Sequence, residues 1–239
     1  MRITLQPAYV LHRRNYRDSS LIVDLFSEDY GRLSVVAKGA RGKPRRGSNA
    51  ALLQPFSPLL ISCSGRSELK TLGAYEAAAQ PIALVGEQVF SGLYLNELIV
   101  RLLHSEDAYP SLFHSYIATL QLLAQGELLD VVLRRFEFTL LQELGYGFDL
   151  ALDGMSGEVL QADRWYVFHS EYGLVADASV RSGNVPAFAG EQLLALSEGQ
   201  YDKASRQCAK RLMRCVLDSH LGGKPLRSRE LFRRVGGER

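Results

Sequence analysis

Cysteine is scarce in this sequence, which has three among its 239 residues: Cys63, Cys208 and Cys215. Three scattered cysteines cannot form a disulfide framework, and the absence of a Cys-x-x-Cys pair argues against a structural zinc site. Cys208 and Cys215 lie two turns apart on a predicted helix, about 10 Å, which exceeds the ~7 Å limit for a disulfide. We therefore expect buried, reduced cysteines in a cytosolic protein.

Long apolar runs and catalytic motifs are also missing. No run approaches the ~18 apolar residues that span a bilayer, and residues 1–14 lack the apolar stretch of a secretory signal. The sequence has no Gly-x-Ser-x-Gly elbow, phosphate-binding loop or dinucleotide fingerprint, and its five histidines include no His-x-x-x-His pair. These absences predict a protein that is not an enzyme, needs no cofactor or metal and does not enter a membrane.

A strong net charge is absent too, since the formal balance is +2, but the charges are unevenly distributed. Residues 1–80 carry 12 basic and 6 acidic side chains, residues 81–155 carry 3 and 10, and residues 156–239 carry 13 and 10. Two basic segments flank an acidic one. This pattern slightly favours a nucleic-acid partner over none.

The first 80 residues have the apolar alternation of β-strands. In the run 20–26, Leu21, Val23 and Leu25 fall on one face, and the run 32–38 alternates in the same way. Further short runs begin at Tyr9, Phe56 and Glu68, with glycine, aspartate and serine between them. Five such runs predict a small antiparallel barrel or sandwich.

From about residue 81 the apolar spacing becomes helical. It predicts helices over 89–103, 110–123 and 128–144, which we expect to form a bundle, and Gly145 stands where a helix-ending glycine belongs. The less regular residues 146–186 contain two short β runs typical of a hairpin, 165–168 and 173–175, and helical spacing returns at 190–196 and 203–217. The sequence therefore predicts an α+β chain with domains over 1–80 and 81–239, the second carrying a β-hairpin insertion at about 146–186.

The strongest local feature is the run Lys38–Arg46, which has five basic residues in nine. Arg32 and Lys38 fall on one face of the strand that leads into it. A basic loop on a barrel can follow phosphates, although an isolated run of this kind is more often a solvated loop. Aromatic candidates for stacking on bases are Tyr16, Phe26, Tyr30 and Phe56, of which we expect Phe26 and Phe56 to be core residues instead.

Two further basic groups lie in the helical half. Arg134 and Arg135 stand beside an apolar stripe in the acidic segment, where they can receive a carboxylate or pair internally with Asp130 or Glu137. A row at helical spacing can contact phosphate or an acidic peptide, or form an ordinary solvated face; it consists of Arg206, Lys210 and Arg214.

Several motifs in order along the chain resemble the RecO family of recombination mediators. They include Tyr9–Arg14 (YVLHRR), Asp18–Phe26 (DSSLIVDLF), Val36–Gly42 (VAKGARG), Ser91–Leu98 (SGLYLNEL), Leu144–Gly147 (LGYG) and Leu221–Phe232 (LGGKPLRSRELF). The resemblance covers nearly the whole chain. It implies an N-terminal OB fold over residues 1–80 and a helical C-terminal domain, in agreement with the apolar patterns.

The resemblance also implies a function. It implies binding of single- and double-stranded DNA, annealing of complementary strands, and contact with the acidic C-terminal tail of single-stranded-DNA-binding protein. It also implies that such a protein helps to load RecA together with RecR, with RecF as a further candidate partner, which places it in the cytoplasm at the nucleoid. Many relatives carry a four-ligand zinc motif after the Gly-Tyr-Gly position, but residues 148–164 contain neither cysteine nor histidine. We therefore expect packing around Trp165, Tyr166 and Phe168 to hold this hairpin without zinc.

Two sets of site residues follow. The set expected to bind DNA is Arg14, Arg32, Lys38, Arg41, Lys43, Arg45, Arg46, Arg66 and Lys70. An acidic tail that ends in an apolar residue needs an apolar pocket with basic groups at its mouth. The set expected to bind it is Arg134, Arg135, Phe136, Leu140, Arg206, Lys210 and Arg214. The alternative hypothesis is an OB-fold RNA-binding or scaffold protein without annealing activity.

Overall fold

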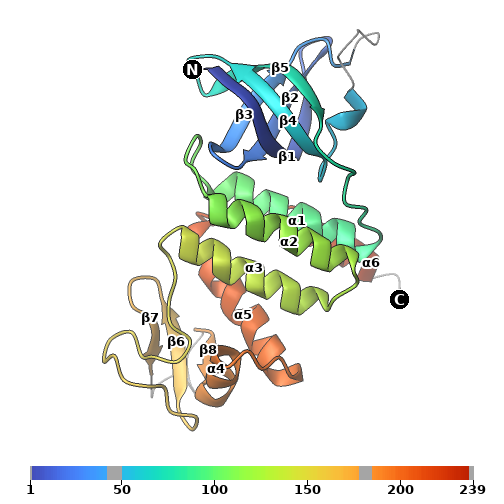
Figure 1. The fold of residues 1–239 in the computed structure, drawn as a ribbon. Helices are drawn as coiled ribbons and strands as arrows, with labels where there is room; N and C mark the ends of the chain where they lie inside the picture. The colour runs from blue at the N-terminus through green and yellow to red at the C-terminus, as the bar shows by residue number, and fades with distance from the viewer. Residues whose placement is uncertain (1, 42–49, 178–184, 237–239) are drawn as a thin grey trace. The chain divides into compact units, whose positions relative to one another are not determined.

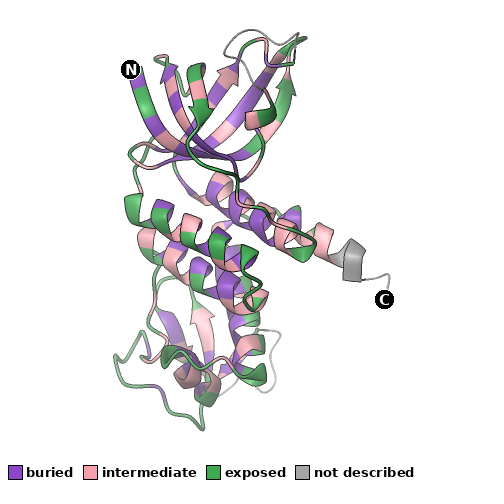
Figure 2. Cartoon of the chain, turned by 45° about the vertical axis from the view of Figure 1, so that its right-hand side comes forward, coloured by how far each residue is buried: buried purple, intermediate pink, exposed green. Residues whose placement is uncertain are grey.

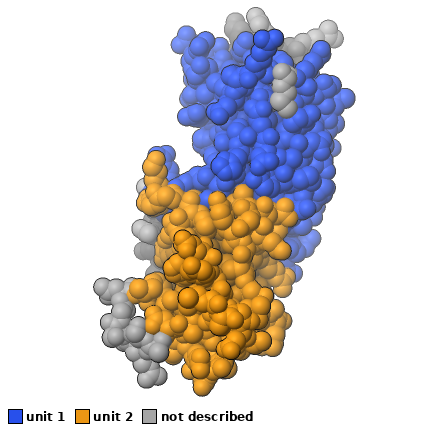
Figure 3. All heavy atoms as spheres, turned by 90° about the vertical axis from the view of Figure 1, so that its left-hand side faces the viewer, with its two compact units in different colours: residues 1–127, 226–239 blue, residues 128–225 orange. Residues whose placement is uncertain are grey.

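The computed structural model describes residues 2–41, 50–177 and 185–236 (Figure 1). The chain divides into two compact units, which Figure 3 colours separately. Unit 1 comprises residues 1–127 and 226–239, and unit 2 comprises residues 128–225. This division follows contacts in the folded chain, whereas the domain boundary predicted near residue 81 follows the change of apolar spacing. That boundary stays a prediction.

Unit 1 begins with a closed five-stranded barrel in the order β1-β2-β3-β5-β4. All neighbouring strands are antiparallel except β3 and β5, which are parallel. The strands are β1 (Arg2–Tyr16), β2 (Ser20–Ser27), β3 (Gly31–Ala37), β4 (Pro58–Ser64) and β5 (Leu69–Ala77). A five-stranded barrel of this kind is an OB fold, and the α+β prediction is confirmed.

The alternation in β2 and β3 determines which side chains enter the barrel. Leu21, Val23 and Leu25 are buried in one core with Leu33 and Val35. Figure 2 shows buried residues along the strands of the barrel. The first strand is much longer than the short run that the sequence predicts from Tyr9. Its pairing with the neighbouring strands is irregular at two places along its length. Such bulges break the period-two pattern by which a strand is recognised in a sequence.

Two helices follow the barrel in unit 1, α1 (Glu87–Leu102) and α2 (Pro110–Ala124). Tyr9 and Phe26 on the outside of the barrel pack edge-on against Phe113 and Tyr116 of α2, with ring centroids 5.4 to 6.0 Å apart. Edge-to-face aromatic pairs of this kind are stabilising beyond the area they bury. Phe26 is fully buried and Phe56 is nearly so, which confirms that both are core residues.

The chain returns to unit 1 at its C-terminal end, where α6 (Ser228–Gly236) packs against α1. The Glu97 carboxylate of α1 accepts hydrogen bonds from the backbone nitrogens of Arg227 and Ser228, at 2.9 and 2.8 Å, and from the Ser228 hydroxyl at 2.6 Å. Partial burial raises the pKa of Glu97, but these hydrogen bonds outweigh it and the pKa is lowered.

The described part of unit 2 contains three helices and three strands, which the sequence only partly predicts. They are α3 (Leu129–Glu143), β6 (Trp165–His169), β7 (Gly173–Ala176), β8 (Ala187–Ala189), α4 (Gly190–Ser197) and α5 (Lys203–His220). The hairpin of β6 and β7 is confirmed. A third strand, β8, pairs with β6 and was not predicted, because three residues are too few to show a period. α3 packs against α5 within this unit. The three helices expected to form one bundle are thus divided between the units.

Hydrogen bonds and aromatic packing hold this hairpin. The Asp153 carboxylate accepts hydrogen bonds from the backbone nitrogens of Met155, Ser156 and Ala176 at 2.8 to 3.0 Å, and so ties the preceding loop to β7. Burial raises the pKa of Asp153, but these bonds lower it by more, so the pKa is below its usual value. Tyr166 is buried as expected and Phe168 packs against Phe148, with ring centroids 5.2 Å apart, whereas Trp165 is 44% exposed.

Within the described residues, no three histidine, cysteine, aspartate or glutamate side chains are grouped so that they could hold a metal ion. Each helix in this described part of the chain is too short or too polar to cross a bilayer.

Candidate nucleic-acid interface

The outer face of β1, β2 and β3 carries basic and aromatic residues toward one end of the barrel. Arg14 pairs across the sheet with Ile22, which pairs with Val36, so these three residues share a face. Tyr16 lies two residues further along the same face of β1, and Lys38 directly follows β3. Arg14 and Lys38 are exposed, as the DNA-binding prediction requires.

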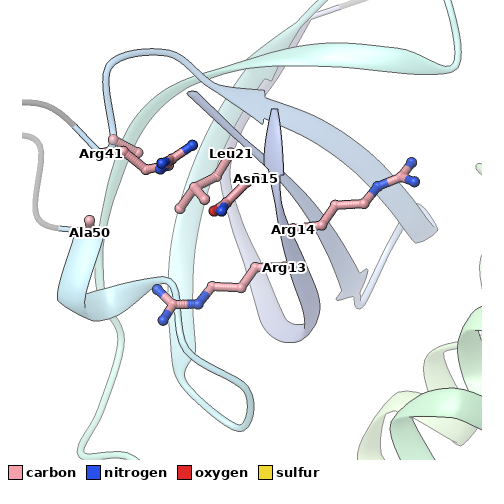
Figure 4. A pocket seen from close by; sticks show the side chains of 7 residues that line it. Arg13, Arg14, Asn15, Leu21, Arg41 and Ala50 are labelled. Carbon is pink, nitrogen blue, oxygen red and sulfur yellow. The ribbon is translucent and has the colours of Figure 1, made fainter. Parts of the chain in front are cut away.

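A hollow of about 570 Å³ lies at this end of the barrel (Figure 4). Its lining residues are Arg13, Arg14, Asn15, Leu21, Ala40, Arg41 and Ala50. None of these described residues is acidic, and three carry a guanidinium group. The side chains of Arg13 and Arg41 lie on the hollow side of the wall and that of Arg14 on the opposite face, and together they create a positive potential that attracts anions. The geometry therefore suits a phosphate-bearing ligand.

Arg41 is held beside the turn that joins β1 to β2. Its backbone nitrogen donates to the carbonyl oxygen of Ser19 at 2.9 Å, and its Nη1 lies 3.4 Å from the carbonyl oxygen of Arg17. The Arg17 guanidinium in turn lies over the ring of Tyr16, 5.1 Å from its centroid. These contacts place Arg17 and Tyr16 at the turn beside Arg41, although neither of them lines the hollow.

Of the predicted basic loop Lys38–Arg46, the structure describes residues 38–41. Lys43, Arg45 and Arg46 lie outside the described residues. The segment that contains them begins after Arg41 and ends before Ala50, and both of these residues line the hollow.

Two residues of the predicted DNA-binding set serve the fold instead. Lys70 is 2% exposed, and its ammonium donates to Glu106 at 2.5 Å and to the carbonyl oxygen of Ser67 at 3.3 Å. Arg32 is partly buried, and its Nε donates to the carbonyl oxygen of Leu103 at 3.1 Å. Both side chains fasten the barrel to the segment between α1 and α2, so we leave them out of the interface. Arg66 is exposed before β5 but does not line the hollow.

The predicted tail-binding residues in unit 2 divide into two kinds. Arg134 forms an ion pair with the fully buried Glu137 at 2.5 Å, which is the internal pairing left open by the sequence. Phe136 and Leu140 are 1% and 0% exposed, so they belong to the core and cannot line an open pocket as they stand. Arg206 pairs with Asp130 at 3.3 Å.

The remaining members of that set face solvent. Arg135 is exposed, and its guanidinium lies over the ring of Tyr201, 5.4 Å from the centroid. Lys210 and Arg214 are exposed one turn apart on α5. Stacking on an aromatic ring holds a guanidinium in place while its N–H edges stay free for a carboxylate.

Sequence reasoning missed Arg13, Arg17 and Tyr201. Arg13 and Arg17 lie within the same five residues as Arg14. This clustering of arginines in the sequence was the signal that could have identified them. No pattern pointed to Tyr201, because its contact with Arg135 joins residues far apart in the sequence.

Comparison with known proteins gives a consistent result. Residues 1–81 match the family model "Recombination protein O N terminal", and residues 86–230 match "Recombination protein O C terminal". The chain is similar to proteins named "DNA repair protein RecO". One from Vibrio cholerae is 46% identical over 232 residues, 97% of this chain and 94% of the relative. One from Pasteurella multocida is 47% identical over 229 residues, 95% of this chain and 93% of the relative. One from Aliivibrio salmonicida is 44% identical over 229 residues, which are 95% of this chain and 94% of the relative.

Proposed function

The chain belongs to the RecO family of DNA repair and recombination proteins, and from this premise we propose that it is a DNA-binding mediator without catalytic turnover. It binds single- and double-stranded DNA through the barrel and anneals complementary strands. The observation that carries the proposal is the hollow lined by Arg13 and Arg41, with Arg14 on the outer face of the same strand beside it. Arginine side chains contact phosphates without reading sequence, which suits a protein that must act on any damaged DNA.

Replacing the three hollow arginines should weaken DNA binding and its dependence on salt. For the variant Arg13→Ala/Arg14→Ala/Arg41→Ala we expect a loss of about tenfold or more in affinity for single-stranded DNA at low salt, because phosphate contacts dominate affinity. The slope of log affinity against log salt should fall by up to about 2, since each phosphate contact contributes ~0.7 for a single strand. Fluorescence anisotropy over a salt series measures both quantities.

The matched control removes the same charge from exposed residues of unit 2, with Arg164→Ala, Lys203→Ala and Lys224→Ala. An equal loss of affinity in the two triple variants would mean that only total charge matters, and would contradict binding at the barrel.

Annealing separates this proposal from an RNA-binding or scaffold protein. A mediator should accelerate pairing of complementary strands that are already covered by single-stranded-DNA-binding protein. A scaffold or an RNA-binding protein should leave that rate unchanged, whatever its affinity for naked DNA.

We also propose that unit 2 binds the acidic tail of single-stranded-DNA-binding protein. The favouring observation is the solvent-facing group Arg135, Lys210 and Arg214, with Arg135 held over Tyr201. Charge-assisted hydrogen bonds from such groups suit carboxylates. By the same family premise, RecR is a partner, RecA is the protein to be loaded, RecF is a further candidate, and the site of action is the cytoplasmic nucleoid.

Arg135→Ala should weaken binding of the tail peptide by about fivefold to tenfold, in line with the loss of one charge-assisted contact. Binding of naked DNA should stay within twofold of the original, about the scatter of such measurements. Anisotropy with a labelled tail peptide and a labelled oligonucleotide tests both. Unchanged peptide affinity would place the tail elsewhere, and an Arg164→Ala variant controls for loss of charge alone.

A further inference from the structure

The interior of the arginine hollow has a chemistry that phosphate binding does not use. Leu21 and Ala40 belong to the barrel core and are 4% and 7% exposed, and Ala50 is half-buried beside them. Ala50, with the small exposed edges of Leu21 and Ala40, forms the apolar part of a hollow whose other lining residues are arginines and Asn15. A site for phosphate alone has no need of an apolar surface, because phosphates are bound by polar groups.

An amide faces the same space. Asn15 pairs across the sheet with Leu21, and Arg13 pairs with the core residue Val23, so both residues occupy positions on the inner face of the barrel wall. Arg14 lies between them and belongs to the opposite face; in Figure 4 its side chain points away from that of Arg13. Among the described residues, the Asn15 side chain has no hydrogen-bond partner.

Resting on the proposed function of DNA binding at the barrel, we infer that this hollow receives one unstacked nucleobase of a single strand. The base lies against Ala50 and the exposed edge of Leu21, the Asn15 amide can donate to or accept from its edge, and Arg13 and Arg41 hold the adjoining phosphates. The volume of about 570 Å³ lies within the ~300–1,000 Å³ typical of small-molecule sites.

This site implies a preference for unpaired DNA. A base can enter the hollow only after it has left its stack and its partner strand, which costs least when the strand is already single. Duplex DNA can reach the arginines with its phosphates but cannot fill the apolar part. The hollow thus gives the barrel a way to distinguish single strands from duplexes without reading their sequence.

The test compares two ligands of equal charge. One is a labelled oligothymidylate of about 12 nucleotides, within the ~4–16 that one OB fold covers, and the other is an abasic oligonucleotide of the same length. We expect the protein to bind the base-bearing strand about tenfold more tightly, as for loss of a base contact of typical strength. The variant Ala50→Leu, which fills the hollow without changing charge, should reduce this ratio to about twofold or less.

Ala51→Leu is the matched control, because Ala51 lies in the same short turn but is exposed and does not line the hollow. It should keep the full ratio. Asn15→Ala, at an exposed position, is a second variant that should lower the ratio, and thermal melts of all three variants check that the barrel is folded.

The outcomes separate the inference from the function on which it rests. Equal binding of the two oligonucleotides by the unaltered protein would overturn the inference while leaving phosphate binding intact. A ratio that survives both Ala50→Leu and Asn15→Ala would also overturn it, since the bases would then bind elsewhere. If neither oligonucleotide responds to the triple arginine variant, it is the proposed function that fails.

Discussion

Gly31→Ala should destabilise unit 1 by about 3 kcal/mol or more. Gly31 begins β3 with φ at +56°, and a Cβ atom built there would overlap the backbone carbonyl oxygen of Asp107. A left-handed conformation costs a non-glycine residue roughly 1–2 kcal/mol, and overpacking typically adds ~1–3 kcal/mol. Backbone atoms cannot yield as the tip of a side chain does. The substitution must therefore separate the barrel from the segment after α1 or strain both.

Gly39→Ala is the control that isolates the clash. Gly39 also has a positive φ, +69°, but a Cβ atom there would meet nothing within 4 Å. We expect this variant to cost only the backbone term of about 1 kcal/mol. Hydrogen exchange of barrel amides measures both variants, and fluorescence of the single tryptophan, Trp165 in unit 2, shows whether the other unit is affected. Equal costs at the two glycines would mean that the Asp107 segment moves aside freely.

The same contact shows where sequence reasoning ends. The run Asp29–Gly31 predicts a turn, and the structure has one there. Nothing near Gly31 in the sequence reveals that Asp107 presses against it. Arg32 and Lys70 are similar cases, because their alternation and charge are those of an exposed basic face. Their partners, Leu103 and Glu106, come from another part of the chain and take both side chains out of solvent.

What could be predicted follows local periodicity. The alternation of β2 and β3 and the helical spacing after residue 81 survive in the structure because burial of one face of each element requires them. The full length of β1 was not predicted, because bulges interrupt its period-two pattern. The strand β8 was not predicted at all, because it is only three residues long. The basic end of the barrel was predicted from charge alone. Its concave shape and the part of Arg13 in it arise only when β1, β2 and the residues around Ala50 meet.

Glu137→Ala should destabilise unit 2 by about 3–5 kcal/mol. The Glu137 carboxylate is fully buried, and its partner Arg134 is 11% exposed at the side chain. Removing the carboxylate leaves a guanidinium group in the interior without its counter-ion. Among the described residues, the Arg134 Nε already has no hydrogen-bond partner. Urea unfolding followed by Trp165 fluorescence measures the loss, because that residue lies in the same unit.

Replacing both members of the pair distinguishes a buried charge from a poorly packed helix. In the variant Arg134→Met/Glu137→Met, neither charge remains and most of the volume is kept, so the cost should be well below that of Glu137→Ala, about 1 kcal/mol or less. A double variant as unstable as the single one would show that shape, not charge, is what matters at this position.

The double variant also separates the roles of two neighbouring arginines. If Arg134 is structural and Arg135 is the residue that meets the acidic tail, the Arg134→Met/Glu137→Met protein should bind the tail peptide nearly as well as the original. Arg135→Ala should bind it less well at unchanged stability, because its exposed side chain contributes little to folding. Loss of peptide binding in the folded double variant would instead mean that the buried pair opens to admit the tail, with Arg134 exchanging Glu137 for the carboxylate of the partner.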